Sequence, residues 1–159
     1  MREAVRRKDR EITDLTRIAE ILQAGEVVSV AFGGDGPYVI PMNYGFTAEN
    51  GKFTLYFHGA QEGEKIERIK ADPRTAFTAY ANNRIYGKGD EGSSYTSSFD
   101  SVCGRGRIRF LEGEEKRTGL AALMAHYAPG REFAFPEKML AVTCVMALEV
   151  EEITGKHHD

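Results

Sequence analysis

Cysteine is scarce in this sequence. The 159 residues include only Cys103 and Cys144, and these do not form a CxxC pair. A disulfide framework or a zinc site needs more cysteines at short spacings, so we expect two neutral, buried thiols. No apolar run approaches the ~20 residues that a membrane-spanning helix needs. The charged first seventeen residues lack the apolar core of a secretory signal. These absences favour a cytoplasmic protein without membrane contact.

A basic excess and the common catalytic motifs are absent too. The net charge is −3, whereas a general nucleic-acid surface needs a surplus of Lys and Arg. The glycines form neither GxxxxGK[ST] nor GxGxxG, so the nucleoside-triphosphate and dinucleotide fingerprints do not apply. No serine lies in a GxSxG elbow, and no cluster of His, Cys and carboxylates has metal-ligand spacing. We therefore expect a small-molecule ligand, no nucleic acid and no metal.

Strand-forming residues dominate what is present. Residues 26–32 and 38–46 are rich in β-branched and aromatic residues, and residues 52–58 alternate apolar and polar side chains. Glycine-containing turns separate them, which predicts a three-stranded antiparallel meander with Pro41 at an edge. Further strands are expected at residues 74–80, 99–110 and 140–150, and helices from Thr13 to Gly25, before Asp72 and over residues 114–127.

The other segments lack periodicity. Residues 1–10 predict a charged arm, and residues 151–159 follow the last strand, with 155–159 as a tail. Residues 81–98 are polar and rich in Gly and Ser, which predicts a long loop that is functional or disordered. About six strands with peripheral helices indicate a mainly β, antiparallel barrel fold in a single domain over residues 1–159.

The segment FHGAQEGEKIERI, residues 57–69, carries the most chemical information. Gly59 and Gly63 allow the backbone to approach a ligand closely, and the start of a helix offers free N–H groups. Lys65 in its first turn adds a full positive charge, so the segment is suited to binding a phosphate. An ordinary strand-to-helix turn with a solvated lysine explains the same residues equally well. His58 alone is more often structural than catalytic.

Five segments in fixed order resemble a known family: YVIPMNYGF, FTLYFHGAQEGEKIERI, DPRTAF, SFDSVCGRGRI and TGK. From about Arg6 to Lys156, the chain is similar to the nitroimidazole-resistance branch of the FMN-binding split barrels, relatives of pyridoxamine 5′-phosphate oxidase. The resemblance implies a six-stranded split barrel that forms a homodimer with FMN at the interface. It also implies a set of cofactor-binding residues: Val39, Ile40, Pro41, Met42 and Asn43 at the isoalloxazine edge; His58, Gly59, Ala60, Gly63 and Lys65 at the phosphate and ribityl chain; and Ser101, Val102, Thr154, Gly155 and Lys156 from neighbouring strands or the partner subunit.

The resemblance implies an activity as well. It suggests an FMN-dependent oxidoreductase that passes electrons from a nicotinamide donor to a small acceptor such as a nitroaromatic, with His58 as the catalytic residue. The flavin would carry the chemistry and the protein would tune it, with Lys156 a candidate cation near N1 and O2. TGKHHD replaces the Arg-rich C-terminal motif of true pyridoxamine-phosphate oxidases, which argues against pyridoxine-phosphate oxidation. Two alternatives stay open: a non-catalytic flavin- or haem-binding module, and pyruvoyl- or histidine-based chemistry without flavin.

Overall fold

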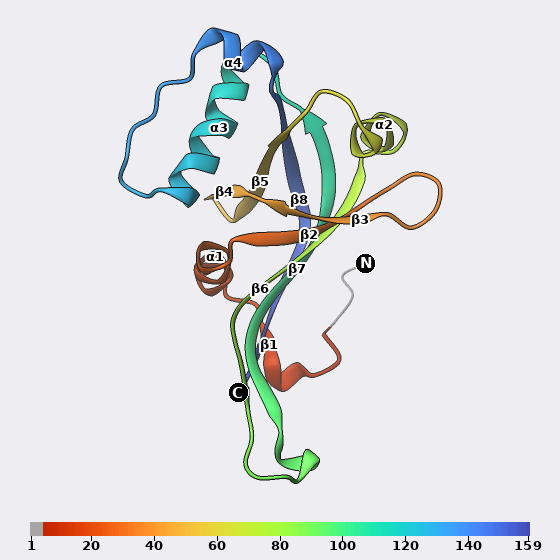
Figure 1. The fold of residues 1–159 in the computed structure, drawn as a ribbon, viewed down its shortest axis with the longest axis vertical. Coiled ribbons are helices and arrows are strands. Elements are labelled where there is room, and N and C mark those ends of the chain that lie inside the picture. The colour runs from red at the N-terminus through yellow and green to blue at the C-terminus, as the bar shows by residue number, and fades with distance from the viewer. Residues whose placement is uncertain (1–4) are drawn as a thin grey trace.

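A single antiparallel sheet of eight strands forms the centre of the molecule and curls around a buried core (Figure 1). The computed structural model describes residues 5–159. Along the sheet the strand order is β3-β2-β6-β7-β8-β5-β4, and β1 pairs with β8 off this path. The strands are β1 (Glu11–Ile12), β2 (Val27–Phe32), β3 (Val39–Asn43), β4 (Gly45–Glu49), β5 (Lys52–Gly59), β6 (Arg74–Tyr86), β7 (Thr96–Phe110) and β8 (Cys144–His158).

Three helices pack against this sheet. α1 lies against β6 and β7, α3 packs on β4, β5 and β8, and α2 sits where β5 leads into β6 (Figure 1). None of the helices in residues 5–159 is long and apolar enough to cross a membrane. The helices are η1 (Lys8–Arg10), α1 (Leu15–Ala24), α2 (Glu64–Ala71), η2 (Gly92–Ser94), α3 (Glu114–Tyr127) and α4 (Glu137–Val142).

The main core fills the inside of the sheet. Phe53, Leu55 and Phe57 point into it while His58 at the end of the same strand is exposed, which confirms the predicted alternation of β5. The apolar side of α1 closes this core with Ile18, Ile21 and Leu22. A second, smaller cluster lies beneath α3 and α4. It comprises Leu111, Leu120, Leu123, Leu140, Val145 and Ala147.

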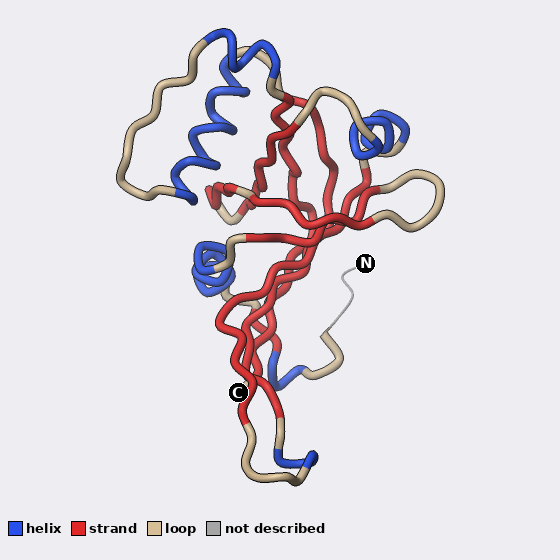
Figure 2. The backbone as a smooth tube through the Cα atoms, in the orientation of Figure 1, coloured by secondary structure: helices blue, strands red, loops and turns tan. Residues whose placement is uncertain are grey.

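The predicted loop at residues 81–98 is wrong. β6 continues to Tyr86 and β7 starts at Thr96, so the two strands form a hairpin arm that projects from the barrel, with η2 at its tip (Figure 2). The arm carries no alternating burial pattern because it leaves the core and both of its faces reach solvent. Backbone hydrogen bonds between β6 and β7 hold the arm together, and a bulge interrupts their pairing between Ala81 and Arg84. Because these bonds require no apolar pattern, the arm cannot be recognised from the sequence.

The predicted meander is also wrong. β2 pairs with β3 and β4 with β5, but β3 and β4 lie at opposite edges of the sheet. The single strand expected at residues 38–46 divides at Tyr44, whose ring is fully buried and whose hydroxyl donates to the Leu22 carbonyl (2.5 Å). Pro41 lies on the edge strand β3, as predicted. This division and the short strand β1 account for eight strands where six were expected.

The C-terminal prediction needs correction at both ends. Leu140 belongs to α4 rather than to a strand, and β8 runs to His158, so residues 151–159 are not a tail. Their strand is held between β7 and β1, with Lys156 opposite both Ser101 and Glu11. The expectation of two buried thiols is wrong for Cys103, which is exposed on β7, while Cys144 is half-buried.

The predicted helices are confirmed with small changes. Asp14, not Thr13, caps α1: its Oδ1 accepts the Thr16 N–H (2.9 Å). α1 ends at Gly25 as expected, yet Gly25 has φ −80° rather than a left-handed conformation. Glycine is required there by space, because a Cβ would lie 2.9 Å from the Tyr44 hydroxyl. The expected charged arm lies partly outside the described residues; its remainder contains η1.

Candidate functional site

The loop between β5 and α2 brings Gly59 and Lys65 together. Gly63 has φ +131°, a conformation that favours glycine, and α2 starts with the Ile66 N–H donating to the Gly63 carbonyl (3.1 Å). The Lys65 side chain turns back toward β5, so that a Cβ added at Gly59 would lie 3.4 Å from Nζ. Lys65 is half-buried and makes no ion pair within residues 5–159. The ammonium therefore lies beside Gly59, with no counter-ion among residues 5–159.

A cavity of about 550 Å³ opens beside His58. It joins two predicted residues, His58 and Asn43, and the Asn43 amide donates to the Glu26 carbonyl (3.1 Å). His126 from α3 forms part of the wall: Nδ1 lies 2.5 Å from the Tyr44 carbonyl oxygen and Nε2 lies 3.3 Å from that of Gln23. The full lining is Gln23, Ala24, Gly25, Glu26, Asn43, His58, His126 and Tyr127.

Two residues of the cavity lining, His126 and Tyr127, were not predicted from the sequence. Both lie in the last turns of α3, which the sequence predicts only as an amphipathic helix. Their approach to His58 depends on how α3 packs against β4 and β5, and no local pattern reports that packing.

The second group of predicted residues lies on β7 and β8. Ser101 pairs with Lys156 and Val102 with Gly155. Val102 is fully buried and a Cβ at Gly155 would meet Ile12, so these two positions face the core. Ser101 and Lys156 face outward, where the Lys156 ammonium lies 5.7 Å from the centre of the Phe99 ring. Of this group, Ser101 and Lys156 are thus available to a ligand through their side chains.

Thr154 stands out in the same group. Its hydroxyl oxygen is buried and is the one buried side-chain polar atom without a hydrogen-bond partner among residues 5–159. It pairs with Cys103, whose sulfur lies 3.3 Å from the Thr78 hydroxyl. A buried hydroxyl without a partner is costly, so this position is suited to an additional polar group.

The loop and the C-terminal group do not meet within one copy of the chain. His58 pairs with Val145 on β8, and Thr154 lies nine positions further along that strand. At ~3.3 Å per residue the two are about 30 Å apart.

The outward residues of β3, namely Val39, Pro41 and Asn43, lie on the same side of the sheet as the C-terminal group. The strand register connects five residues in one row across five strands: Pro41, Ser29, Thr78, Cys103 and Thr154. Ile40 and Met42 pack toward the core.

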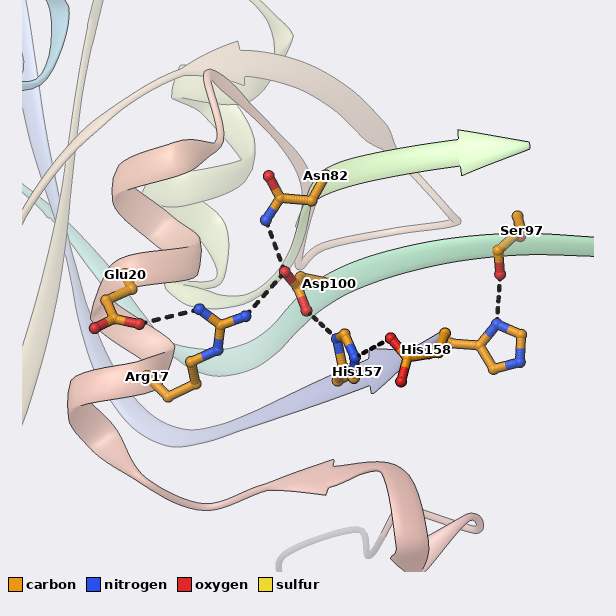
Figure 3. Close-up of polar contacts among 8 residues, drawn as sticks. Arg17, Glu20, Asn82, Ser97, Asp100, His157 and His158 are labelled. Carbon is orange, nitrogen blue, oxygen red and sulfur yellow. Dashed lines mark hydrogen bonds and ion pairs between the residues drawn. The ribbon is translucent and has the colours of Figure 1, made fainter. Parts of the chain in front are cut away.

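A polar network around Asp100 holds the end of β8 against β7 and α1 (Figure 3). Asp100 is only 3% exposed, and its carboxylate accepts hydrogen bonds from Asn82 (2.7 Å) and Arg17 (3.2 Å). His157 Nδ1 lies 2.6 Å from the same carboxylate, and Nε2 lies 2.7 Å from Asp159. Burial opposes ionisation of Asp100, but these partners together hold its pKa below the ordinary value. The two carboxylates raise the pKa of His157.

The loop and the adjoining cavity both offer groups that bind ligands. Within residues 5–159, no group of three or more His, Cys, Asp or Glu side chains could hold a metal ion. The loop presents a cation near the start of α2, and the adjoining cavity is lined by imidazole, amide and phenol groups. Such a site is suited to hold a phosphorylated cofactor and a small polar substrate.

Comparisons with known proteins find a matching family model and solved structures of the same fold. The family model described as pyridoxamine 5′-phosphate oxidase matches residues 14–157. A proposed 5-nitroimidazole antibiotic resistance protein from Bacteroides thetaiotaomicron is 29% identical, with a TM-score of 0.79 over 92% of this chain and 86% of that chain.

Two further solved structures share the fold. An FAD and heme binding protein from Mycobacterium smegmatis has a TM-score of 0.81 at 20% identity, over 94% of this chain and 74% of its own. The flavocytochrome Anf3 from Azotobacter vinelandii has a TM-score of 0.78 at 20% identity, over 99% and 73%. A search of curated proteins finds no match. Because the family model covers nearly the whole chain, the protein belongs to the pyridoxamine 5′-phosphate oxidase family.

Proposed function

We propose that the protein binds a flavin, specifically FMN, through the loop at residues 58–65, and passes electrons from a nicotinamide donor to a small acceptor. The observation that carries this proposal is the Lys65 ammonium, half-buried over Gly59 and without a protein counter-ion in the described chain. A phosphate beside it would accept from the first amides of α2 and from Nζ. Nothing lies within 4 Å of a Cβ built at Gly63, so the loop leaves room on that side.

The family supports a redox role. When bound, the flavin would supply the electron-transfer chemistry, and the chain would bind and orient it. His58 lies in the wall of the 550 Å³ cavity and is our candidate catalytic residue, because a substrate in that cavity would contact its ring. The nitroimidazole-resistance relative favours a nitroaromatic acceptor.

A non-catalytic flavin- or haem-binding module is the second candidate. The names of the FAD and heme binding protein and the flavocytochrome support it. An absorption spectrum of the purified protein, followed by anaerobic titration with NADH or NADPH, separates the two. Bleaching of a flavin spectrum and its return with a nitroaromatic is expected for the oxidoreductase, whereas an unreactive flavin or a Soret band favours the binding module.

We further propose a homodimer in which the outer face of the sheet is the interface. Val27 is 43%, Val39 62%, Tyr80 64% and Ile85 74% exposed, and all four lie on β2, β3 and β6. Large apolar side chains gathered on one face are typical of a surface that a partner covers. A twofold dimer would place the C-terminal group of one copy beside the loop of the other, which one copy alone separates by about 30 Å.

The cofactor is tested by heat release and by the variant Lys65→Ala. We expect the released compound to be FMN; stoichiometric FAD or haem would contradict that identity. Loss of one charge-assisted bond to phosphate, ~1.5–3 kcal/mol, predicts a tenfold to hundredfold weaker FMN affinity in a fluorescence titration. Lys52→Ala, at the exposed opposite end of β5, is the matched control and should bind as wild type. Wild-type affinity in Lys65→Ala would reduce the loop to an ordinary turn.

The dimer is tested by placing a charge on its proposed interface. Tyr80→Glu should shift the mass measured by light scattering from dimer to monomer at micromolar concentration, because a buried unpaired carboxylate is strongly unfavourable. Val142→Glu carries the same change at a position of similar exposure, 68%, on α4, and should remain dimeric. A wild-type monomer that retains flavin would rule the interface out.

A further inference from the structure

A second, smaller cavity lies at Gln61 of the loop at residues 58–65. It has a volume of about 250 Å³, and the rest of its lining comes from α2, α3, the end of β7 with the residues after it, and residues 143–145. Gln61 of the loop reaches across to α4 and donates to the Ala141 carbonyl (2.8 Å). The lining comprises Gln61, Ile66, Lys70, Phe110, Leu111, Glu112, Lys116, Thr143, Cys144 and Val145.

Positive charge gathers around this cavity. Lys116 is half-buried and makes no ion pair within the described residues 5–159, while Lys70 has only an exposed contact with Glu67 (3.5 Å). Glu112 is the single carboxylate in the lining. A half-buried ammonium that faces a cavity without a counter-ion is available to bind an anion.

The same lysines also affect the pKa of the half-buried Cys144 thiol. Burial raises its pKa, and the positive charges of Lys116, Lys65 and Lys70 act in the opposite direction, with Glu112 reinforcing burial. Two of these lysines, Lys116 and Lys70, line the cavity together with Cys144. The neutral donors add less attraction than a full charge, because one N–H of the Gln61 amide is used on α4 and the Thr143 hydroxyl donates to the Met139 carbonyl (2.7 Å).

We propose that this cavity binds a phosphoryl oxyanion, with Lys116 and Lys70 as its ligands. A volume of about 250 Å³ is enough for a phosphate or pyrophosphate, and it is smaller than the ~300–1,000 Å³ typical of sites for drug-sized ligands. Ammonium groups bind phosphate oxygens as point charges without a fixed orientation. The site rests on Lys116 and Lys70 and does not depend on the proposed flavin site, whose cation is Lys65.

Inorganic pyrophosphate is the probe, titrated calorimetrically into the purified full-length protein at low salt. Wild type should show saturable binding, and Lys116→Gln should weaken it by at least tenfold. Lys116→Arg should retain binding because it keeps the charge, and Lys138→Gln, an exposed lysine on α4 outside the lining, should bind as wild type. Lys70→Gln, an exposed position, repeats the test should Lys116→Gln fail to fold.

The origin of the oxyanion is resolved by a second arm that compares FMN with FAD. If Lys116→Gln weakens FAD but not FMN, the cavity takes the second phosphate of a dinucleotide; if it weakens pyrophosphate alone, the ligand is a free oxyanion. Pyrophosphate binding that depends on Lys116 in a protein that binds no flavin would uphold this site and refute only the proposed function. Absence of saturable pyrophosphate binding in wild type, or equal binding in Lys116→Gln, would overturn the oxyanion site.

Discussion

Asp100 is the position where one substitution tests the structure most directly. Asp100→Asn keeps the shape of the side chain but removes the charge that faces Arg17 and His157. Removing one partner of a buried ion pair costs ~3–5 kcal/mol. Arg17 and His157 are 42% and 44% exposed, so water solvates them in the variant. We therefore expect a smaller loss, about 2 kcal/mol in the free energy of unfolding.

The loss should depend on pH in a defined direction. The folded-state pKa of His157 is raised, so its contribution is complete below the unfolded pKa of ~6.5 and disappears as pH rises through the folded value. The folded-state pKa of Asp100 is lowered, so its contribution is present above ~3.9 and disappears as pH falls through the folded value. The difference between wild type and Asp100→Asn should therefore be largest at about pH 5–6 and smaller above pH 8.

Urea unfolding of both proteins between pH 5 and pH 9 measures this difference. In thermal unfolding at pH 6, the expected loss corresponds to a midpoint temperature about 4–8 °C lower for Asp100→Asn than for wild type. His157→Gln should also remove the decrease in the free energy of unfolding that wild type shows as pH rises above about 6. His158→Gln should leave that decrease unchanged, because the His158 ring faces the Ser97 carbonyl rather than a carboxylate. A difference between wild type and Asp100→Asn that stays constant across this range would refute the proposed role of the His157 charge.

Two further predictions concern the packing that shapes the 550 Å³ cavity. Gly45→Ala should destabilise the fold by at least ~1–3 kcal/mol in urea unfolding, because its Cβ would lie 2.4 Å from the backbone of α3; Gly92→Ala, with open space around it, should be near neutral, and equal stabilities would contradict the close approach of α3. Tyr44→Phe removes the hydroxyl that donates to the end of α1 and should cost ~1–2 kcal/mol, with an unchanged free energy of unfolding arguing against that bond.

Local patterns predict the elements that alternate or repeat regularly. The alternation of β5 and the helical spacing of α1 and α3 place these elements correctly, because burial on one face requires a periodic apolar pattern. The hairpin arm escapes prediction because its strands lie outside the core and bury neither face. The end of β8, residues 151–158, was not predicted because its partners there, β1 and β7, come from distant parts of the sequence.

The candidate site also has one part that follows from adjacent residues and another that depends on distant ones. The glycines, Lys65 and the start of α2 are adjacent in the sequence, so the sequence by itself determines the loop for which we propose phosphate binding. The cavity beside His58 joins α1, β3, β5 and α3, and the Asp100 network joins α1, β6, β7 and β8. Only the tertiary structure decides these contacts, because sheet pairing and helix packing bring side chains together without leaving any pattern in the residues between them.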